Sequence, residues 1–191
     1  MQENKKGNVG FSAVSLLLIS GFIACLVALV NSITAPVIAE HGVESLKENI
    51  ALIFAGSEDF DDITGTVTET SGVEAIYNVK SATGGEDNYC VHTSTAGYGG
   101  AVELLVGFNC DGQIAGVAVL SADSETPGVG QKITEKQFLN GFKGLSYNDE
   151  GAKVDGVTGA TVSSKAALSG VNSACVAIDK ILNGEEEEVS A

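Results

Sequence analysis

The feature that most constrains this chain is a long stretch near its start without a charged side chain. No Asp, Glu, Lys or Arg occurs from Gly7 to Ala39, and the run from Val9 to Val30 is mostly apolar. As a helix rising about 1.5 Å per residue, that run reaches about 33 Å, enough to cross a hydrocarbon layer of about 30 Å. The sequence therefore predicts a transmembrane helix at residues 9–30, surrounded by membrane lipid.

Charge on the two sides of this span predicts its direction. Lys5 and Lys6 precede it, whereas nearly all of the 25 acidic residues, which give a net charge of −15, follow it. Because basic residues favour the cytoplasmic side, we expect residues 1–8 in the cytoplasm and the rest of the chain outside the cell membrane. The same negative charge repels a polyanion, so nucleic acid is not expected as a partner.

A cleaved signal peptide or a lipoprotein leader is the alternative for the same stretch. The apolar run is longer than the roughly 7 to 15 residues of a signal peptide core. Pro36 follows the best small-residue cleavage site, at residues 32–35, and disfavours cleavage there. The bulky Phe22 and the apolar residues after Cys25 do not fit a lipoprotein signal. The sequence thus favours an uncleaved anchor.

Beyond the span, the patterns predict a connector and a run of strands and helices. Residues 31–60 are expected to form a membrane-proximal helical connector, because apolar residues recur at helical spacing from Val43 to Ile53. Strands are predicted at residues 64–70, 73–79, 87–95, 101–108 and 113–121, the last two joined by a turn ending in Asp111-Gly112. Helices are predicted at residues 135–142 and 161–182.

Runs of strands framed by helices indicate an α+β domain with a mainly antiparallel sheet and a long C-terminal helix. We expect this domain at residues 61–184, followed by an acidic tail at residues 185–191. His41 and His92 lack cysteine or acidic partners at ligand spacing, so no metal site is expected. The four cysteines form no C-x-x-C pair and indicate no disulfide scaffold, although a bridge between Cys90 and Cys110 stays open.

The segment from Asp155 to Ser164, with the sequence DGVTGATVSS, carries the most chemical information. Its small residues lead into the first turn of the predicted C-terminal helix. Unpaired backbone N–H groups and the positive end of the helix dipole favour an anion there, and a phosphate suits such a place. The alternative is a helix cap formed by Thr158, Thr161 or Ser163, which from the pattern alone is the commoner explanation.

The same segment resembles the flavin-attachment motif of the FMN-binding domain family. In that motif, to which residues 158–161 (TGAT) and the preceding Asp155 are similar, the last threonine carries FMN through a phosphoester bond. Residues 125–132 (ETPGVGQK) resemble a loop of the G subunit of the Rnf electron-transport complex and of its homologue, the C subunit of the sodium-pumping NADH:quinone reductase. Residues 97–100 (GYGG) and 106–112 match the same family.

The resemblance implies a membrane-anchored electron-transfer subunit of Rnf type, with other subunits as partners and no catalytic residue of its own. It implies that a separate flavin transferase attaches FMN to Thr161. The whole complex would move electrons between reduced ferredoxin and NAD with coupled transport of Na⁺ or H⁺. The residues implied to bind or surround the cofactor, besides Thr161, are Glu125, Thr126, Val129, Gly130, Lys132, Asp155, Thr158, Gly159 and Ala160.

Three other functions stay open at this point. The chain is alternatively a C-type subunit of the sodium pump, a stand-alone anchored extracytoplasmic flavin reductase, or a binding module in which residues 158–161 only cap a helix. The short chain and its single predicted span favour the Rnf subunit. For residues 125–132 the alternative to a flavin contact is a plain turn set by Pro127 and Gly128.

Overall fold

The computed structural model describes residues 7–57, 59–66, 70–81, 85, 87–149 and 154–184. By its internal contacts the chain divides into two compact units, Met1–Glu44 and Ser45–Ala191. Residues 1–6 of the expected cytoplasmic start, with Lys5 and Lys6, and the expected tail at residues 185–191 lie outside the described residues.

A single continuous helix, α1 (Gly7–Ile53), covers the predicted anchor and the predicted connector up to Ile53, whereas residue 60, at the end of the predicted connector, begins a strand. Its stretch Phe11–Ser32 is long and apolar enough to cross a membrane, with a mean hydropathy of 2.7 and no side chains buried within the chain. The last turns of α1, from Ser45 onward, belong to the second unit.

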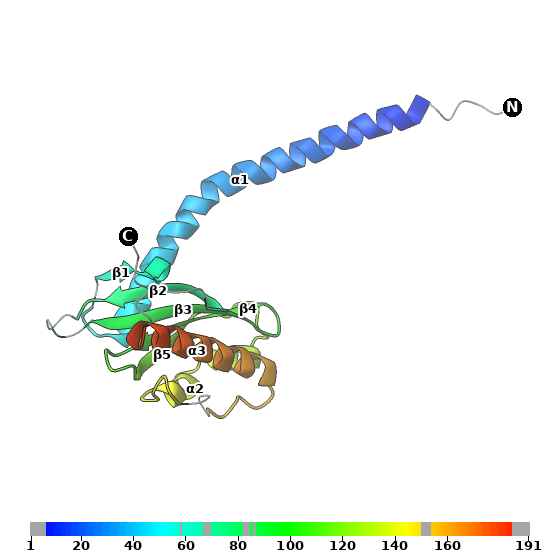
Figure 1. Cartoon of the computed structure of the whole chain (residues 1–191). Coiled ribbons are helices and arrows are strands. Elements are labelled where there is room, and N and C mark those ends of the chain that lie inside the picture. The colour runs from blue at the N-terminus through cyan, green and yellow to red at the C-terminus, as the bar shows by residue number, and fades with distance from the viewer. Residues whose placement is uncertain are drawn as a thin grey trace. The chain divides into compact units, whose positions relative to one another are not determined.

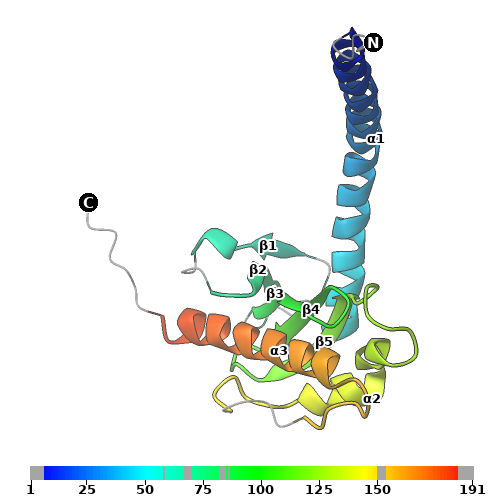
Figure 2. The ribbon, with the colours of Figure 1, turned by 90° about the vertical axis from the view of Figure 1, so that its right-hand side faces the viewer.

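Five strands form one antiparallel sheet in the order β1-β2-β3-β4-β5. They are β1 (Phe60–Asp62), β2 (Val73–Val79), β3 (Asn88–Ala96), β4 (Ala101–Phe108) and β5 (Ile114–Ser121). The last helix that the structure describes is the long α3 (Thr161–Leu182), which lies against the sheet (Figures 1 and 2). The predicted α+β class, antiparallel sheet and C-terminal helix are confirmed.

The predicted β4–β5 hairpin is present, and its turn explains why. Asn109 N–H donates to Gln113 O at 2.9 Å, and Gly112 N–H donates to Asn109 O at 2.9 Å. Gly112 has φ +78°, a left-handed conformation that glycine adopts without steric cost. The hairpin therefore forms where the Asp-Gly signal placed it.

The strand predicted at residues 64–70 is wrong. The described part is a 3₁₀ turn, η1 (Thr64–Thr66), and residues 67–69 lie outside the described residues. The Asp62 carboxylate accepts a hydrogen bond from Thr64 N–H at 2.9 Å, a local bond that competes with strand pairing. The Thr64 hydroxyl in turn accepts from Ile76 N–H at 2.9 Å. The short strand β1, just before this turn, was not predicted.

The helix predicted at residues 135–142 is present in two short pieces, α2 (Lys136–Leu139) and the 3₁₀ turn η3 (Asn140–Phe142). A further 3₁₀ turn, η2 (Gly130–Thr134), precedes them. Phe138 and Phe142 are buried, with ring centroids 5.4 Å apart and edge to face. They join the core between α3 and one face of the sheet, whose members include Val91, Leu104 and Val171.

The opposite face of the sheet is covered by the last turns of α1. Leu46, Ile50 and Phe54 are buried there with residues of β2, β3 and β4. The approach is close at Gly107 of β4, where an added Cβ would lie 2.9 Å from the Phe54 ring. This packing explains why the second unit begins within α1.

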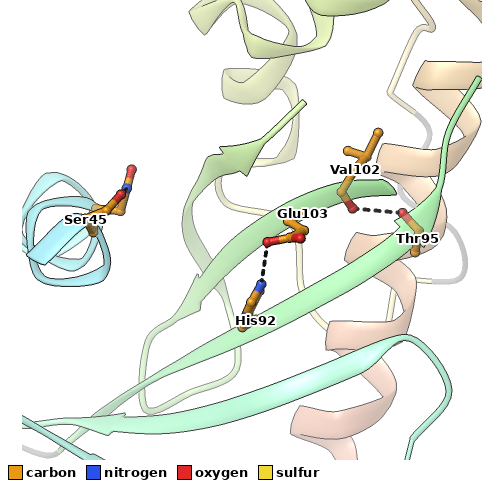
Figure 3. Close-up of polar contacts among 6 residues, drawn as sticks. Ser45, His92, Thr95, Val102 and Glu103 are labelled. Atoms are coloured by element: carbon orange, nitrogen blue, oxygen red, sulfur yellow. Dashed lines mark hydrogen bonds and ion pairs between the residues drawn. The ribbon is translucent and has the colours of Figure 1, made fainter. Parts of the chain in front are cut away.

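Polar contacts link β3 and β4 on both faces of the sheet (Figure 3). On the α1 side, His92 Nε2 lies 3.4 Å from a carboxylate oxygen of Glu103. Thr95 Oγ1 donates to Ala166 O of α3 at 2.9 Å and lies 3.4 Å from Val102 O. Cys90, also in β3, is buried, whereas Cys110 is exposed in the hairpin turn, and no disulfide joins these two described residues.

Candidate functional site

Three segments that are distant in the sequence meet around one pocket of about 370 Å³. They are the turn between β3 and β4, the loop between β5 and η2, and the start of α3. The residues that line the pocket are Tyr98, Thr126, Val129, Gly130, Gly159, Ala160, Thr161, Val162 and Ser163. The pocket thus gathers residues from three of the four motifs that the sequence singled out, those at residues 97–100, 125–132 and 155–164.

The loop after β5 is a tight turn fixed by its own backbone. Val129 N–H donates to Thr126 O at 3.1 Å, across Pro127 and Gly128. Gly128 has φ +72°, as the third position of a type II turn requires. The turn that Pro127 and Gly128 predicted is therefore present, and it brings Val129 and Gly130 to the pocket.

The segment before α3 folds in the same manner. Ala160 N–H donates to Val157 O at 3.0 Å, and the intervening Gly159 has φ +84°. The buried Ser164 hydroxyl accepts from Val157 N–H at 2.9 Å and holds this turn against the first turn of the helix. As a result, the pocket side of the turn is formed by Gly159, Ala160 and Thr161.

No side chain caps the start of α3. Its N-cap residue is Ala160, which has no hydrogen-bonding side chain, and no side-chain cap bond is made there. The cap by Thr158, Thr161 or Ser163 that the sequence left open is therefore absent from this described helix start. Backbone N–H groups of the first turn remain open at the pocket, and the exposed Thr161 lies beside them.

Beneath the pocket lies a buried carboxylate, Glu125, with an exposed fraction of 1 %. Its Oε1 accepts from Tyr98 N–H at 2.7 Å and from Gly99 N–H at 3.1 Å, and the Ser163 hydroxyl donates to its Oε2. Burial by itself raises the pKa of Glu125, but the hydrogen bonds from Ser163, Gly99, Tyr98 and Gly100 outweigh it, so the pKa lies below its usual value. The side chain is therefore an anion at neutral pH.

Of the ten residues that the resemblance implied, some line the pocket and others do not. Six of them line the pocket: Thr126, Val129, Gly130, Gly159, Ala160 and Thr161. Four do not belong to the lining: Glu125 is buried below it, and Lys132, Asp155 and Thr158 are exposed outside it.

Three lining residues were absent from the predicted set: Tyr98, Val162 and Ser163. Val162 and Ser163 directly follow Thr161, so the first turn of the predicted helix was a signal for them. Tyr98 stood in the GYGG match, but only the folded sheet shows that this turn reaches the start of α3.

Comparison with known proteins points to one kind of protein. The FMN-binding domain family matches residues 97–176, a range that contains every residue lining the pocket. The G subunit of an ion-translocating oxidoreductase complex of Methanosarcina acetivorans is 32% identical over 84% of this chain and 89% of its own length. The G subunit of a Na⁺-translocating ferredoxin:NAD⁺ oxidoreductase complex of Acetobacterium woodii is 31% identical over 82% and 85%.

A third relative covers nearly the whole chain. It is the G subunit of a proton-translocating ferredoxin:NAD⁺ oxidoreductase complex of Clostridium ljungdahlii, 26% identical over 97% of this chain and all of its own length. Among solved structures, the C subunit of the Na⁺-translocating NADH-quinone reductase of Parabacteroides distasonis has a TM-score of 0.52 at 19% identity, covering 68% of this chain and 80% of that one. NqrC of Shewanella oneidensis has a TM-score of 0.55 at 17% identity, covering 70% and 91%.

Proposed function

Because the chain belongs to the family of G subunits of ion-translocating oxidoreductase complexes, we propose that its pocket at the start of α3 holds FMN and that it relays electrons within such a complex. The relatives named above are oxidoreductase subunits, and this chain is a redox subunit of the Rnf type rather than a complete enzyme. Its partners are other subunits of a membrane redox complex.

The phosphate end of FMN suits the start of α3. The open N–H groups of the first turn and the positive end of the dipole of a 22-residue helix attract an anion. No acidic side chain lies in that first turn to oppose it. The buried charge of Glu125 is already engaged by the donors of Tyr98, Gly99 and Ser163.

The strongest support for FMN binding comes from exposed apolar side chains at the pocket. Among the described residues from Ser45 onward, the large exposed hydrophobic side chains are Leu52, Tyr98, Val129, Val162 and Val176. Three of these five line this pocket, with exposed fractions of 73% for Tyr98, 41% for Val129 and 49% for Val162. Such clustering beside a phosphate-binding helix start is what a flat aromatic ring needs.

Bound FMN supplies reversible uptake and release of electrons, and the chain's own residues determine where this takes place. The first turn of α3 holds the phosphate end. Tyr98, Val129 and Val162 exclude water from the faces of the ring that they cover. The hydrogen-bonded turns on both sides keep these side chains in place, so that the ring stays within reach of neighbouring redox centres.

The proposal extends to a covalent attachment at Thr161. This side chain is exposed, lies in the pocket and forms no hydrogen bond with any residue that the structure describes, so its hydroxyl is available to lose its proton as a phosphoester forms. A separate flavin transferase would carry out the attachment with FAD as the donor: the bond between the two phosphates of FAD breaks, AMP leaves, and the FMN phosphate is bonded to Thr161 Oγ1. The remaining implied residues, Glu125, Lys132, Asp155 and Thr158, do not line this site.

Mass spectrometry of the full chain tests the proposed function. After co-expression with a flavin transferase, the intact protein is expected to gain the mass of one FMN less one water, and fragmentation should assign it to Thr161. A chain that stays unmodified and also fails to bind free FMN would contradict the proposal and leave an anchored binding module.

The sodium-pump subunit remains the second candidate because the solved structures above share its fold. At 17–19% identity they carry the fold alone, whereas the G subunits are 26–32% identical over most of this chain. Turnover of a small acceptor by the isolated chain would instead favour a stand-alone flavin reductase.

We also propose that Phe11–Ser32 spans the cell membrane with the N-terminus inside and the flavin domain outside, in line with the positive-inside rule. Protease added to intact spheroplasts is expected to digest the flavin domain, while a cytoplasmic control protein stays whole. Protection in spheroplasts together with digestion in inverted vesicles would reverse this orientation.

A further inference from the structure

Glu125 is in contact with two of the three segments that build the pocket and belongs to the third. One carboxylate oxygen accepts the N–H groups of Tyr98 and Gly99 at 2.7 and 3.1 Å, and the other accepts the Ser163 hydroxyl. Glycines leave the room for this group, since an added Cβ at Gly97 or Gly130 would overlap or crowd its oxygens. The carboxylate therefore occupies space that the absence of side chains at Gly97 and Gly130 leaves open.

We propose that Glu125 is a positioning residue, which joins the Tyr98 turn to the first turn of α3 and so sets the spacing of the Tyr98 ring and Thr161 across the pocket. Its significance for flavin rests on the function proposed above. The joining itself depends only on the contacts of Glu125. This role differs from the direct flavin contact that the resemblance implied, because the side chain is buried and lies outside the pocket lining.

A carboxylate suits this position better than any neutral side chain. The hydrogen-bond partners of its carboxylate are donors: the backbone N–H groups of Tyr98, Gly99 and Gly100 in the turn, and the Ser163 hydroxyl. Both oxygens of a carboxylate accept, so every donor is satisfied at once. A glutamine of equal size must turn its own N–H₂ group either to the backbone N–H groups or to Ser163. In each case at least one existing contact is lost or reversed, and an unsatisfied buried donor is costly.

Loss of the Glu125 contacts would affect the pocket because the pocket lies between the Tyr98 turn and the start of α3. Tyr98 reaches the pocket from the turn after β3, and Ser163 lies two residues beyond Thr161 in α3. Without the link through Glu125, the turn and the helix start lose the hydrogen bonds that join them at the pocket, and only contacts farther away, such as Thr95 Oγ1 donating to Ala166 O, still hold β3 to α3. The pocket would then hold a flavin attached at Thr161 less rigidly, even though the attachment point is intact.

The experiment compares the full chain in detergent micelles, loaded with FMN by the transferase, as wild type, Glu125→Gln and Ser163→Ala. Glu103→Gln is the matched control, because this carboxylate lies on β4 with His92 and not at the pocket. Amide hydrogen exchange of residues 98–100 and 161–163 is measured, together with the visible circular dichroism of the flavin. The latter reports the asymmetric surroundings of the ring and does not respond to stability alone.

In Glu125→Gln, amide exchange in the Tyr98 turn is expected to rise at least about tenfold, since its N–H groups lose a charged acceptor. The flavin dichroism should fall while its covalent mass is retained. In Ser163→Ala the dichroism should also fall, but exchange in the Tyr98 turn should stay nearer to the wild type, because that half of the link remains. Glu103→Gln should change neither quantity.

Unchanged exchange and unchanged dichroism in Glu125→Gln would overturn the proposal, as would equal changes in Glu103→Gln. Should Glu125→Gln fail to fold, the comparison of Ser163→Ala with the wild type decides the outcome through the dichroism. If the wild type itself takes up no FMN, the proposed function fails. The exchange rates of the unloaded proteins then still decide whether Glu125 joins the two segments.

Discussion

Replacing Thr161 by alanine is expected to abolish covalent attachment of FMN while leaving the domain folded. The substitution removes the hydroxyl that would form the phosphoester. It should cost little stability, within about 0.5 kcal/mol, because the side chain is exposed and caps no N–H group of α3. The measurement is flavin fluorescence of the denatured protein after electrophoresis, alongside thermal unfolding in detergent.

Thr158→Ala is the matched control, since Thr158 offers the same exposed hydroxyl three residues earlier but does not line the pocket. It should keep most of the covalent flavin. Fluorescence that persists in the Thr161 variant and disappears in the Thr158 variant would move the attachment to the other threonine. Fluorescence in both variants would contradict an attachment through either residue.

The second large effect is expected at Gly99, in the turn between β3 and β4. A Cβ added there would overlap the carbonyl oxygen of Ser124, a backbone atom that cannot rotate away. Gly99→Ala must therefore separate this turn from the loop after β5 and disturb the hydrogen bond from Gly99 N–H to Glu125. We expect a loss of about 3 kcal/mol in unfolding free energy, or about 10 °C in Tm, measured by thermal unfolding in detergent.

Gly128→Ala is the control that distinguishes the steric overlap at Gly99 from the backbone strain of placing an alanine at a glycine with positive φ. Gly128 has φ +72° but open space around its Cα, so an alanine there meets strain and no overlap. Its cost should be about 1 kcal/mol. A Gly99 variant as stable as the Gly128 variant would mean that the turn and the loop are not held as closely as described.

Much of the fold was predictable because its signals are local. The bounds of β2, β4 and α3 agree with the predicted ranges, since the β-branched and other apolar residues of the two strands and the helical apolar stripe of α3 lie within each segment. The hairpin turn at Gly112 needed only its own residues. The turn at Thr64 was missed because the Asp62 side chain, two residues away, replaces the pairing that its threonines and valine suggest.

The pocket was predictable only in part, because some of its contacts join segments that are far apart in the sequence. Thr161, the proposed attachment residue, and the glycines belong to contiguous motifs, whereas the proposed role of Glu125 depends on two segments that are far away in the sequence. From the sequence, Glu125 beside Thr126 and Pro127 looked like an exposed turn residue or a flavin contact. Its burial arises because three glycine-containing segments converge, which no spacing along the chain reveals.

The order of strands in the sheet has a consequence for when the cofactor can be attached. Every strand pairs with its neighbour in the sequence, so each strand can pair with the one synthesised just before it at little cost in loop-closure entropy. Helix α3 comes last and supplies both Thr161 and the helix start that completes the pocket. During synthesis the pocket, with Thr161 as its proposed attachment residue, is therefore complete only after all five strands have emerged, and the proposed flavin attachment would be a late step that requires a folded domain.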